Sequence, residues 1–192
     1  MITQRDREIL KFVDEYGYIT IEQAKVLFFN DKNLGTGYEM ARRRLSMLVK
    51  VGELKSGKIQ TNNKNVYYKG IKPSYHNITI IDCLCKLVEV GAKIIRFEKN
   101  KSWLDDLIIS DAYCECEFND CIYQFIFEIC YMNKNIPIQN YVKLYSTFDT
   151  NSMCPLIVKV NLLGENKKNY GALKDCIVDV DYQFNQFAKI FI

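Results

Sequence analysis

The chain has 192 residues, a length that forms one domain or two small ones. Hydrophobic residues make up 48% of it and charged residues 26%, a composition that supports a packed core and excludes a globally disordered chain. Apolar runs such as residues 78–81 are too short to cross a bilayer, and residues 1–7 lack the apolar core of a signal peptide. We therefore expect a cytoplasmic protein that does not bind a membrane.

The net charge of +3 is unevenly distributed along the chain. Residues 1–72 hold fourteen Lys and Arg against eight Asp and Glu, a net charge of +6, whereas residues 73–192 have a net charge of −3. Pro73 follows Gly70 in a segment typical of a turn. We therefore predict two domains, residues 1–72 and residues 73–192, and the charge of the first is suited to a polyanion such as DNA.

Capping residues and apolar spacing predict three short helices in the first domain. Two capping boxes precede apolar residues at helical spacing, Thr3 with Asp6 and Thr20 with Gln23. The segment Gly35-Thr36-Gly37 predicts a break in the chain, after which a third helix is expected from Tyr38 to about Gly52. Residues 53–55 and 66–69 then have strand composition and flank a polar segment, which predicts a β-hairpin. Helices followed by a hairpin indicate a winged helix-turn-helix.

The third helix would be the recognition helix of such a domain. Ala41, Leu45 and Leu48 share one face and should be buried, which turns the polar and basic side chains outward. We expect the following residues at the DNA: Thr36, Tyr38, Glu39, Arg42, Arg43, Arg44, Ser46 and Lys50 on or beside this helix, and Lys58 and Lys64 in the hairpin.

Three consecutive arginines cannot all lie on one face of a helix that turns 100° per residue. We expect Arg42 and Arg43 to approach the major groove or its phosphates, and Arg44 to lie at the flank. The arginine side chain suits both tasks, because it can bind guanine or phosphate through two hydrogen bonds. A solvated basic helix packed against an acidic neighbour is the alternative.

Four segments carry a family resemblance: residues 3–10, 18–23, 41–45 and 49–54. They look like the replication-relaxation family of plasmids and phages, which is similar in turn to many winged-helix regulators. The resemblance covers roughly residues 2–69. It implies DNA binding in the maintenance of a plasmid or phage, in its replication or in the control of that replication. We therefore expect a sequence-specific double-stranded DNA-binding protein that acts in transcriptional regulation or in control of replication or transfer.

Apolar patterning of the second domain predicts the order α-β-β-β-α-β. The expected elements are a helix at 78–90, strands at 93–97, 107–117 and 121–131, a helix at 137–148, a strand at 155–160, and a segment at 184–192 that closes a sheet edge. This order is similar to the restriction-endonuclease-like fold, which the C-terminal part of the family also resembles. The fold class expected for the whole chain is thus α+β, a winged helix followed by a degenerate nuclease-like α/β domain.

The resemblance also implies where a nuclease would hold its metal. In active members of that fold an Asp ends one strand and a Glu-x-Lys lies on the next; the carboxylates bind a divalent cation and the lysine helps to position water. Asp111 and Glu128 match the carboxylates, but Cys130 stands where the lysine would be. We therefore expect no enzyme activity and no cofactor. The alternative is a metal-dependent nuclease that uses Asp111 and Glu128, with Lys143 as its lysine.

Two Cys-x-Cys pairs, Cys83/Cys85 and Cys114/Cys116, raise the alternative of a zinc site. Structural zinc sites usually separate their cysteines by two to four residues, so we expect no metal and expect all eight cysteines of the chain to be reduced, buried thiols. With catalysis discounted, we expect the second domain to pair two copies into a homodimer that contacts two DNA half-sites. A protein-interaction adaptor is a further alternative, and it predicts no salt-dependent affinity for DNA.

Overall fold

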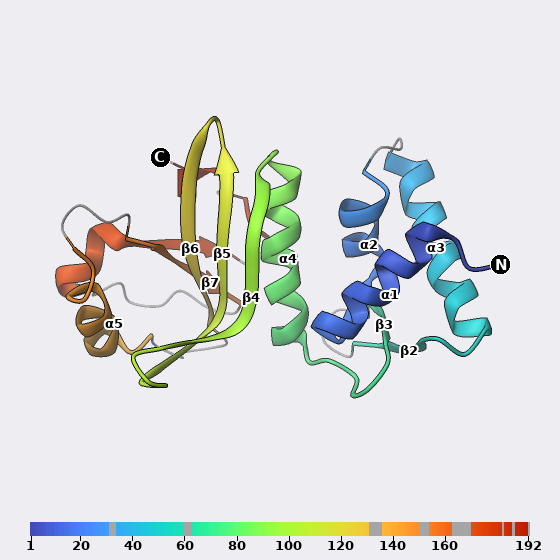
Figure 1. The fold of residues 1–192 in the computed structure, drawn as a ribbon, viewed down its shortest axis with the longest axis horizontal. Coiled ribbons are helices and arrows are strands. Elements are labelled where there is room, and N and C mark those ends of the chain that lie inside the picture. Colours follow the sequence, from blue (N-terminus) through green and yellow to red (C-terminus); the bar gives the residue numbers. More distant parts are fainter. Residues whose placement is uncertain are drawn as a thin grey trace. The chain divides into compact units, whose positions relative to one another are not determined.

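The fold is a mixed α+β arrangement of helices, a three-stranded antiparallel sheet and a mixed five-stranded sheet (Figure 1). The computed structural model describes residues 1–30, 34–59, 63–130, 136–149, 154–162, 170–181, 183–185 and 187–191. The chain divides into two compact units, Met1–Cys85 and Lys86–Ile192. Within the described residues, no helix has both the length and the apolar character needed to cross a bilayer.

The first unit orders its elements as helix, strand, helix, helix, strand and strand. Their bounds are α1 Gln4–Tyr16, β1 Tyr18–Thr20, α2 Ile21–Phe28, α3 Leu34–Lys50, β2 Lys55–Lys58 and β3 Asn65–Tyr68, before α4, Tyr75–Glu89, begins. The strands form an antiparallel sheet in the order β1-β3-β2. Apolar side chains from all three helices and from the sheet form one core, which includes Ile9, Ile19, Ala24, Leu45 and Tyr67.

Both predicted capping boxes are present. The Thr3 side chain accepts a hydrogen bond from the backbone of Asp6, and the Asp6 carboxylate accepts one from the backbone of Thr3 at 2.6 Å. Thr20 and Gln23 repeat this exchange at the start of α2. Gly17 ends α1 in the left-handed conformation, at φ +91°.

The predicted break at Gly35-Thr36-Gly37 was wrong, because α3 begins at Leu34 and this segment lies within its first turns. A glycine costs a helix only about 1 kcal/mol relative to alanine. Burial of the apolar side chains along α3 outweighs that local preference. The predicted hairpin is present, but its first strand is displaced: β2 spans Lys55–Lys58, whereas residues 53–55 were expected as strand and residues 56–58 as loop.

An ion pair between the buried Asp6 and the half-buried Arg44 connects α1 to α3. The Asp6 carboxylate is fully buried, and it accepts a hydrogen bond from Arg44 Nε at 2.8 Å and a second one from Arg44 Nη2. Burial by itself would raise the pKa of Asp6. The hydrogen bonds from Arg44 and Thr3, together with the arginine charge, outweigh burial and hold that pKa below its ordinary value.

The buried amide of Gln23 connects α2 to the start of α4. Its Nε2 donates to the Ile78 carbonyl at 3.1 Å and to Asp82 Oδ1 at 2.8 Å. The Tyr18 hydroxyl donates to another carbonyl of the same helix. These bonds attach the first turns of α4 to the first unit. The division between the units accordingly falls inside α4, whereas the sequence placed the domain junction at Pro73.

The second unit is built on a sheet with the strand order β4-β5-β6-β7-β8. The bounds are β4 Lys93–Trp103, β5 Ile108–Phe118, β6 Cys121–Cys130, α5 Ile138–Tyr145, β7 Leu156–Asn161, η1 Gly171–Cys176, β8 Ile177–Asp181 and η2 Phe187–Phe191. Strands β4 to β6 are antiparallel, and β6, β7 and β8 are parallel. The predicted order of helix, three strands, helix and strand is present, and β8 is an additional strand.

The C-terminal segment does not close a sheet edge as predicted; β8 forms that edge and the segment contains the 3-10 helix η2. The reason is the aromatic content of η2. The ring of Phe187 lies parallel to that of Phe127 at 6.4 Å, and the ring of Phe191 meets that of Phe125 edge-on at 5.4 Å. The segment therefore buries its rings against β6. On the opposite face of the sheet, residues of α5 and η1 pack over Ile126, Ile157 and Ile177.

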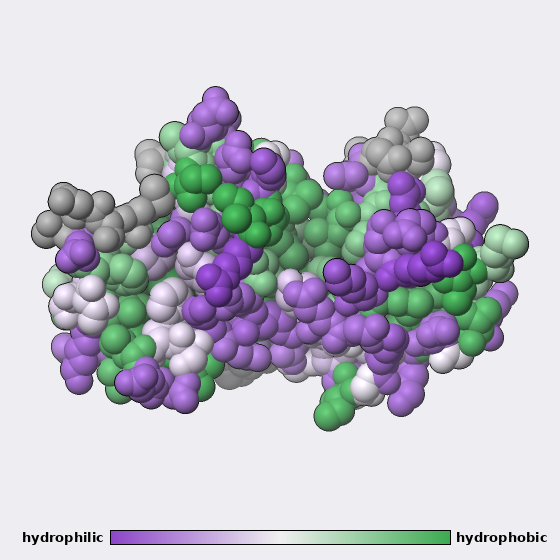
Figure 2. All heavy atoms as spheres, viewed as in Figure 1, coloured by the Kyte–Doolittle hydropathy of each residue, from purple (hydrophilic) through white to green (hydrophobic). Residues whose placement is uncertain are grey.

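The edge strand β4 carries charge along most of its length, and Figure 2 shows hydrophilic side chains over its middle. Glu98 forms ion pairs with Arg96 and with Lys101 on the same strand. The pairing register with β5 shifts between Ile94 and Arg96, as in a β-bulge. Charges and a bulge both protect an edge from pairing with a further strand.

Replacing Asp6 by asparagine should destabilise the first unit by about 2–3 kcal/mol, because Arg44 loses its charged partner and the capping box is weakened. Circular dichroism in urea, with hydrogen exchange of α1 and α3, measures the loss. The matched control is Asp14→Asn on the same helix, whose carboxylate is 57% exposed and pairs with Lys69 at the surface. The control should cost less than about 1 kcal/mol. Equal effects of the two changes would contradict the role assigned to Asp6.

The stabilisation from Asp6 should also depend on pH. Because the carboxyl has a lower pKa in the folded state than its ordinary value of 3.8, its contribution is complete above that value. It is lost as the pH falls from there through the folded-state pKa, since the protonated acid no longer attracts Arg44. The difference in unfolding free energy between the wild type and Asp6→Asn should therefore narrow below about pH 4. If the difference in unfolding free energy stayed constant from pH 7 to pH 2, the charge of Asp6 would not be the source of the stabilisation.

Candidate functional site

The exposed face of α3 carries most of the side chains predicted at the DNA. Ala41, Leu45 and Leu48 are fully buried, as the spacing predicted, and this sets the rotation of the helix about its axis. Six of the predicted residues are exposed: Thr36, Tyr38, Glu39, Arg42, Arg43 and Lys50. Ser46 is half-buried on the same helix. The sequence therefore identified which face of α3 meets solvent.

The three consecutive arginines have three different environments. Arg42 donates to Glu39 Oε2 through Nη2 at 2.7 Å and through Nε at 3.1 Å. Arg43 is exposed and forms no hydrogen bond or ion pair with a described residue. Arg44 is half-buried and bound to Asp6. Of the three, Arg43 has its guanidinium available, Arg42 shares its guanidinium with Glu39, and Arg44 holds α1 against α3.

The two predicted hairpin lysines also differ. Lys58 is exposed at the end of β2, whereas Lys64 is half-buried with its Nζ 4.0 Å from Asp82 Oδ2. Exposed Lys55 begins β2 and was missed by the sequence analysis, which placed it in a strand without a role. Together, Lys55 and Lys58 give the hairpin two cationic side chains at its surface.

A second candidate site is a row of charged side chains across the five-stranded sheet, here called the polar row: Asp111, Glu128, Lys159 and Asp179. The pairing register sets Glu128 beside Lys159, and Lys159 beside Asp179, on the three parallel strands. Residues that are opposite each other in a sheet share one face. Asp111 on β5 continues the row, with its Oδ2 accepting a hydrogen bond from the Ile129 backbone at 2.7 Å.

Tyrosines from α5 and from the start of η1 cover the polar row. The Tyr141 hydroxyl donates to Glu128, which is 5% exposed. The Tyr170 hydroxyl lies 2.7 Å from Asp179 and 3.4 Å from Nζ of Lys159, which is 1% exposed. Burial first, and then the neighbouring carboxylates, raise the pKa of both tyrosines. Both hydroxyls therefore stay protonated and donate hydrogen bonds to the carboxylates.

The structure brings Asp111 and Glu128 to neighbouring strands, as the nuclease alternative requires. Lys143 is exposed on α5 and forms no ion pair with any described residue, whereas Lys159 is the lysine beside Glu128. Sequence reasoning missed Lys159. Its signal is a lysine inside the otherwise apolar strand Leu156–Asn161, which predicts a buried charge that needs a partner.

The cysteines of both Cys-x-Cys pairs are buried free thiols, whereas Cys121 and Cys154 are exposed, so the expected burial of all eight cysteines was wrong for these two. In the part of the chain that the structure describes, no three His, Cys, Asp or Glu side chains gather in a way that could hold a metal ion.

No protein-family model, curated protein or solved structure matches this chain.

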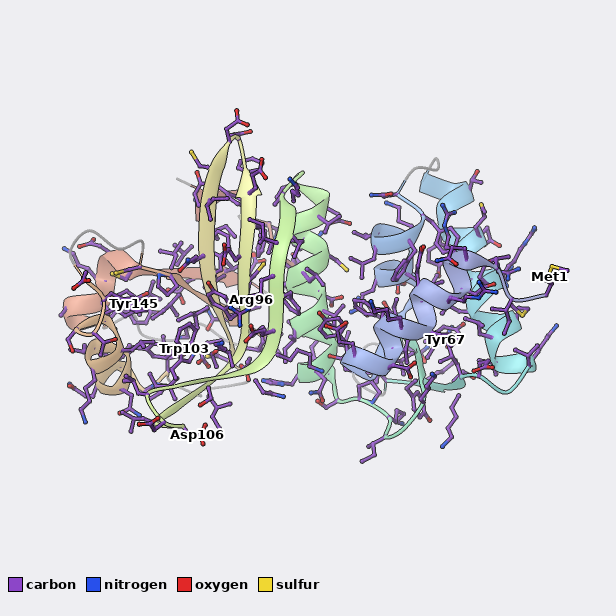
Figure 3. The ribbon with its side chains drawn as sticks, viewed as in Figure 1. Met1, Tyr67, Arg96, Trp103, Asp106 and Tyr145 are labelled. Carbon is purple, nitrogen blue, oxygen red and sulfur yellow. The ribbon has the colours of Figure 1, made fainter. Side chains whose placement is uncertain are left out.

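Lys159→Met should destabilise the second unit by about 3 kcal/mol, because it leaves the buried acid Glu128 and the partly buried acid Asp179 without the cation between them. Lys143→Met is the control, since that lysine is exposed. Fluorescence of Trp103, the single tryptophan of the chain, follows the unfolding of this unit in urea; Figure 3 labels this residue on β4. If Lys159→Met lowered the free energy of unfolding no more than Lys143→Met does, the result would contradict a structural role of the polar row.

Proposed function

We propose that the first unit is a winged helix-turn-helix and that the chain is a sequence-specific double-stranded DNA-binding protein. Its task would be transcriptional regulation, or control of replication or transfer, in a plasmid, phage or other mobile element, as the family resemblance implies. The order helix, strand, helix, helix, strand, strand supports the proposal, as does the sheet order β1-β3-β2. In this arrangement α3 would enter the major groove and the β2–β3 hairpin would lie over the adjacent backbone.

The observation that carries the proposal is a set of exposed cations on α3 and on the hairpin. Arg43 and Lys50 are seven residues apart, or about two helical turns, so their side chains project on the same side roughly 10 Å from each other along the axis. Neither forms an ion pair with a described residue. Lys58 adds a further exposed charge. Each can neutralise a phosphate without first breaking an ion pair within the described part of the chain.

For the second unit, we propose a restriction-endonuclease-like domain that pairs two copies of the chain and is not catalytic. The contacts of the polar row support a structural role. Asp111 accepts a backbone hydrogen bond, Glu128 accepts one from Tyr141, and the buried Lys159 lies between Glu128 and Asp179. The metal-dependent nuclease with Asp111 and Glu128 is the competing function, and cleavage of duplex DNA with Mg²⁺ or Mn²⁺ would favour it.

Arg43→Ala and Lys50→Ala should each weaken binding to duplex DNA by about threefold or more at 0.15 M salt, because each removes one phosphate contact. Each should also reduce the slope of log affinity against log salt by about 1. Fluorescence anisotropy measures both quantities, on the fragment upstream of the protein's own gene and on a scrambled fragment. The control is Lys11→Ala, an exposed lysine on α1 that is outside the proposed interface.

Three outcomes of this assay would decide between the functions. Tighter binding to the upstream fragment, with the DNA recovered intact, supports a regulator. Cleaved DNA supports the nuclease. No binding by the wild type even at low salt would contradict the proposal and favour an adaptor. Sedimentation equilibrium of the free protein tests the proposed homodimer, which a monomer at micromolar concentration would contradict.

A further inference from the structure

We infer that the Glu39–Arg42 pair on α3 selects a G·C base pair, and that the neighbouring cations supply affinity without selecting bases. The inference rests on the proposed DNA binding by α3. The hydrogen-bonded pair Glu39–Arg42 would then determine the sequence preference of α3. This role would also explain why a negatively charged side chain lies on a surface that binds a polyanion.

The geometry of the pair prepares Arg42 to donate in a defined direction. Glu39 and Arg42 are one turn apart, and a single carboxylate oxygen, Glu39 Oε2, accepts from both Nε and Nη2 of the guanidinium. The two side chains are 48% and 50% exposed. The planar guanidinium is thereby held at one edge, and its other N–H groups point away from Glu39. Fixing the plane in advance reduces the conformational entropy lost when Arg42 binds a base.

The chemistry of the two groups matches the major-groove edge of one base pair. Guanine presents the N7 and O6 acceptors, which an arginine binds through two hydrogen bonds, and its partner cytosine presents an N4 amino donor, which a carboxylate accepts. Bases that present acceptors to Glu39 would be repelled by its charge. The pair therefore both attracts the correct base pair and rejects others.

Glu39 opposes nonspecific binding. Hydrogen bonding to Arg42 holds the pKa of Glu39 below its usual range, so the carboxylate is charged at neutral pH. Its charge repels phosphate and competes with phosphate for Arg42. An exposed ion pair of this kind adds little to folding stability. Glu39 thus lowers the affinity for DNA in general and adds little to folding stability. This combination is expected of a residue that determines specificity.

The contrast with Arg43 separates phosphate attraction from base selection on one helix. Arg43 and Lys50 form no hydrogen bond or close ion pair with a described residue, and Arg43 interacts with Glu39 only through its charge. Their donor groups are therefore available to phosphates of any sequence. Changing them should weaken all DNA alike. Changing Glu39 should instead alter which DNA is preferred, and the two kinds of change are distinguishable in one experiment.

The test is selection of bound duplexes from a random library by the full chain, comparing the wild type with Glu39→Gln, Arg42→Lys and Glu15→Gln. Glu15 is an exposed acid on α1 and serves as the charge-matched control. Glu39→Gln should bind random duplex about 3- to 10-fold more tightly, because one repulsive charge is gone, and should lose a G·C preference at one or two positions. Arg42→Lys keeps the charge and should lose the same preference. Glu15→Gln should retain the wild-type preference.

Selected sequences that keep the same preference in Glu39→Gln would overturn the inference, even if that variant bound more tightly, because Glu39 would then act only as a charge. A preference that is lost in Glu15→Gln as well would also overturn it. If the wild type binds no duplex in low salt, DNA binding itself fails and this inference fails with it. Circular dichroism of each variant confirms that the exposed substitutions leave the fold intact.

Discussion

Burying the carboxylate of Asp6 at the start of α1 requires a cation from elsewhere in the chain, and Arg44 of α3 supplies it. The same carboxylate completes the capping box of α1. One side chain thus begins a helix and attaches it to another helix 38 residues away in sequence. Burial of Ala41 and Leu45 sets the rotation of α3 and turns Arg43 to solvent, and the Arg44–Asp6 contact fixes the rotated helix against α1. The candidate DNA surface is held in place by both.

The second unit meets the same constraint by another means. A lysine in the middle of a sheet has no access to water, so Lys159 is placed between acids on the strands at each side, Glu128 and Asp179. The tyrosines above the row donate to the acids and complete their hydrogen bonding. A charge so enclosed stabilises only while its partners stay in place. The polar row therefore makes the register of three parallel strands depend on electrostatics as well as on the apolar core.

Three adjacent arginines illustrate how surroundings divide one residue type among several tasks. Arg44 contributes to folding through Asp6, Arg42 is oriented by Glu39, and Arg43 is left to solvent. If α3 meets DNA, the same division separates structure, base selection and phosphate attraction along three consecutive positions. All three residues are arginines with the same side chain and the same charge, so only the neighbours of each side chain distinguish them.

Features that depend on neighbours in sequence could be predicted from the sequence: the capping boxes at Thr3 and Thr20, the buried face of α3, the hairpin, and the order of elements from α4 to β7. Each follows from periodicity or from contacts spanning three or four residues, which a linear pattern records. The short strand β1, Tyr18–Thr20, was not predicted, because it is defined by its pairing with the distant strand β3. Tertiary structure alone decided the features that depend on distant partners. The glycines at the start of α3 became helical because burial outweighs a weak local preference, and Phe187 joined the core because β6 offered aromatic rings. The lysine beside Glu128 is Lys159 and not the expected Lys143. Strands far apart in sequence become neighbours only when the sheet forms, so the sequence alone did not indicate this pairing.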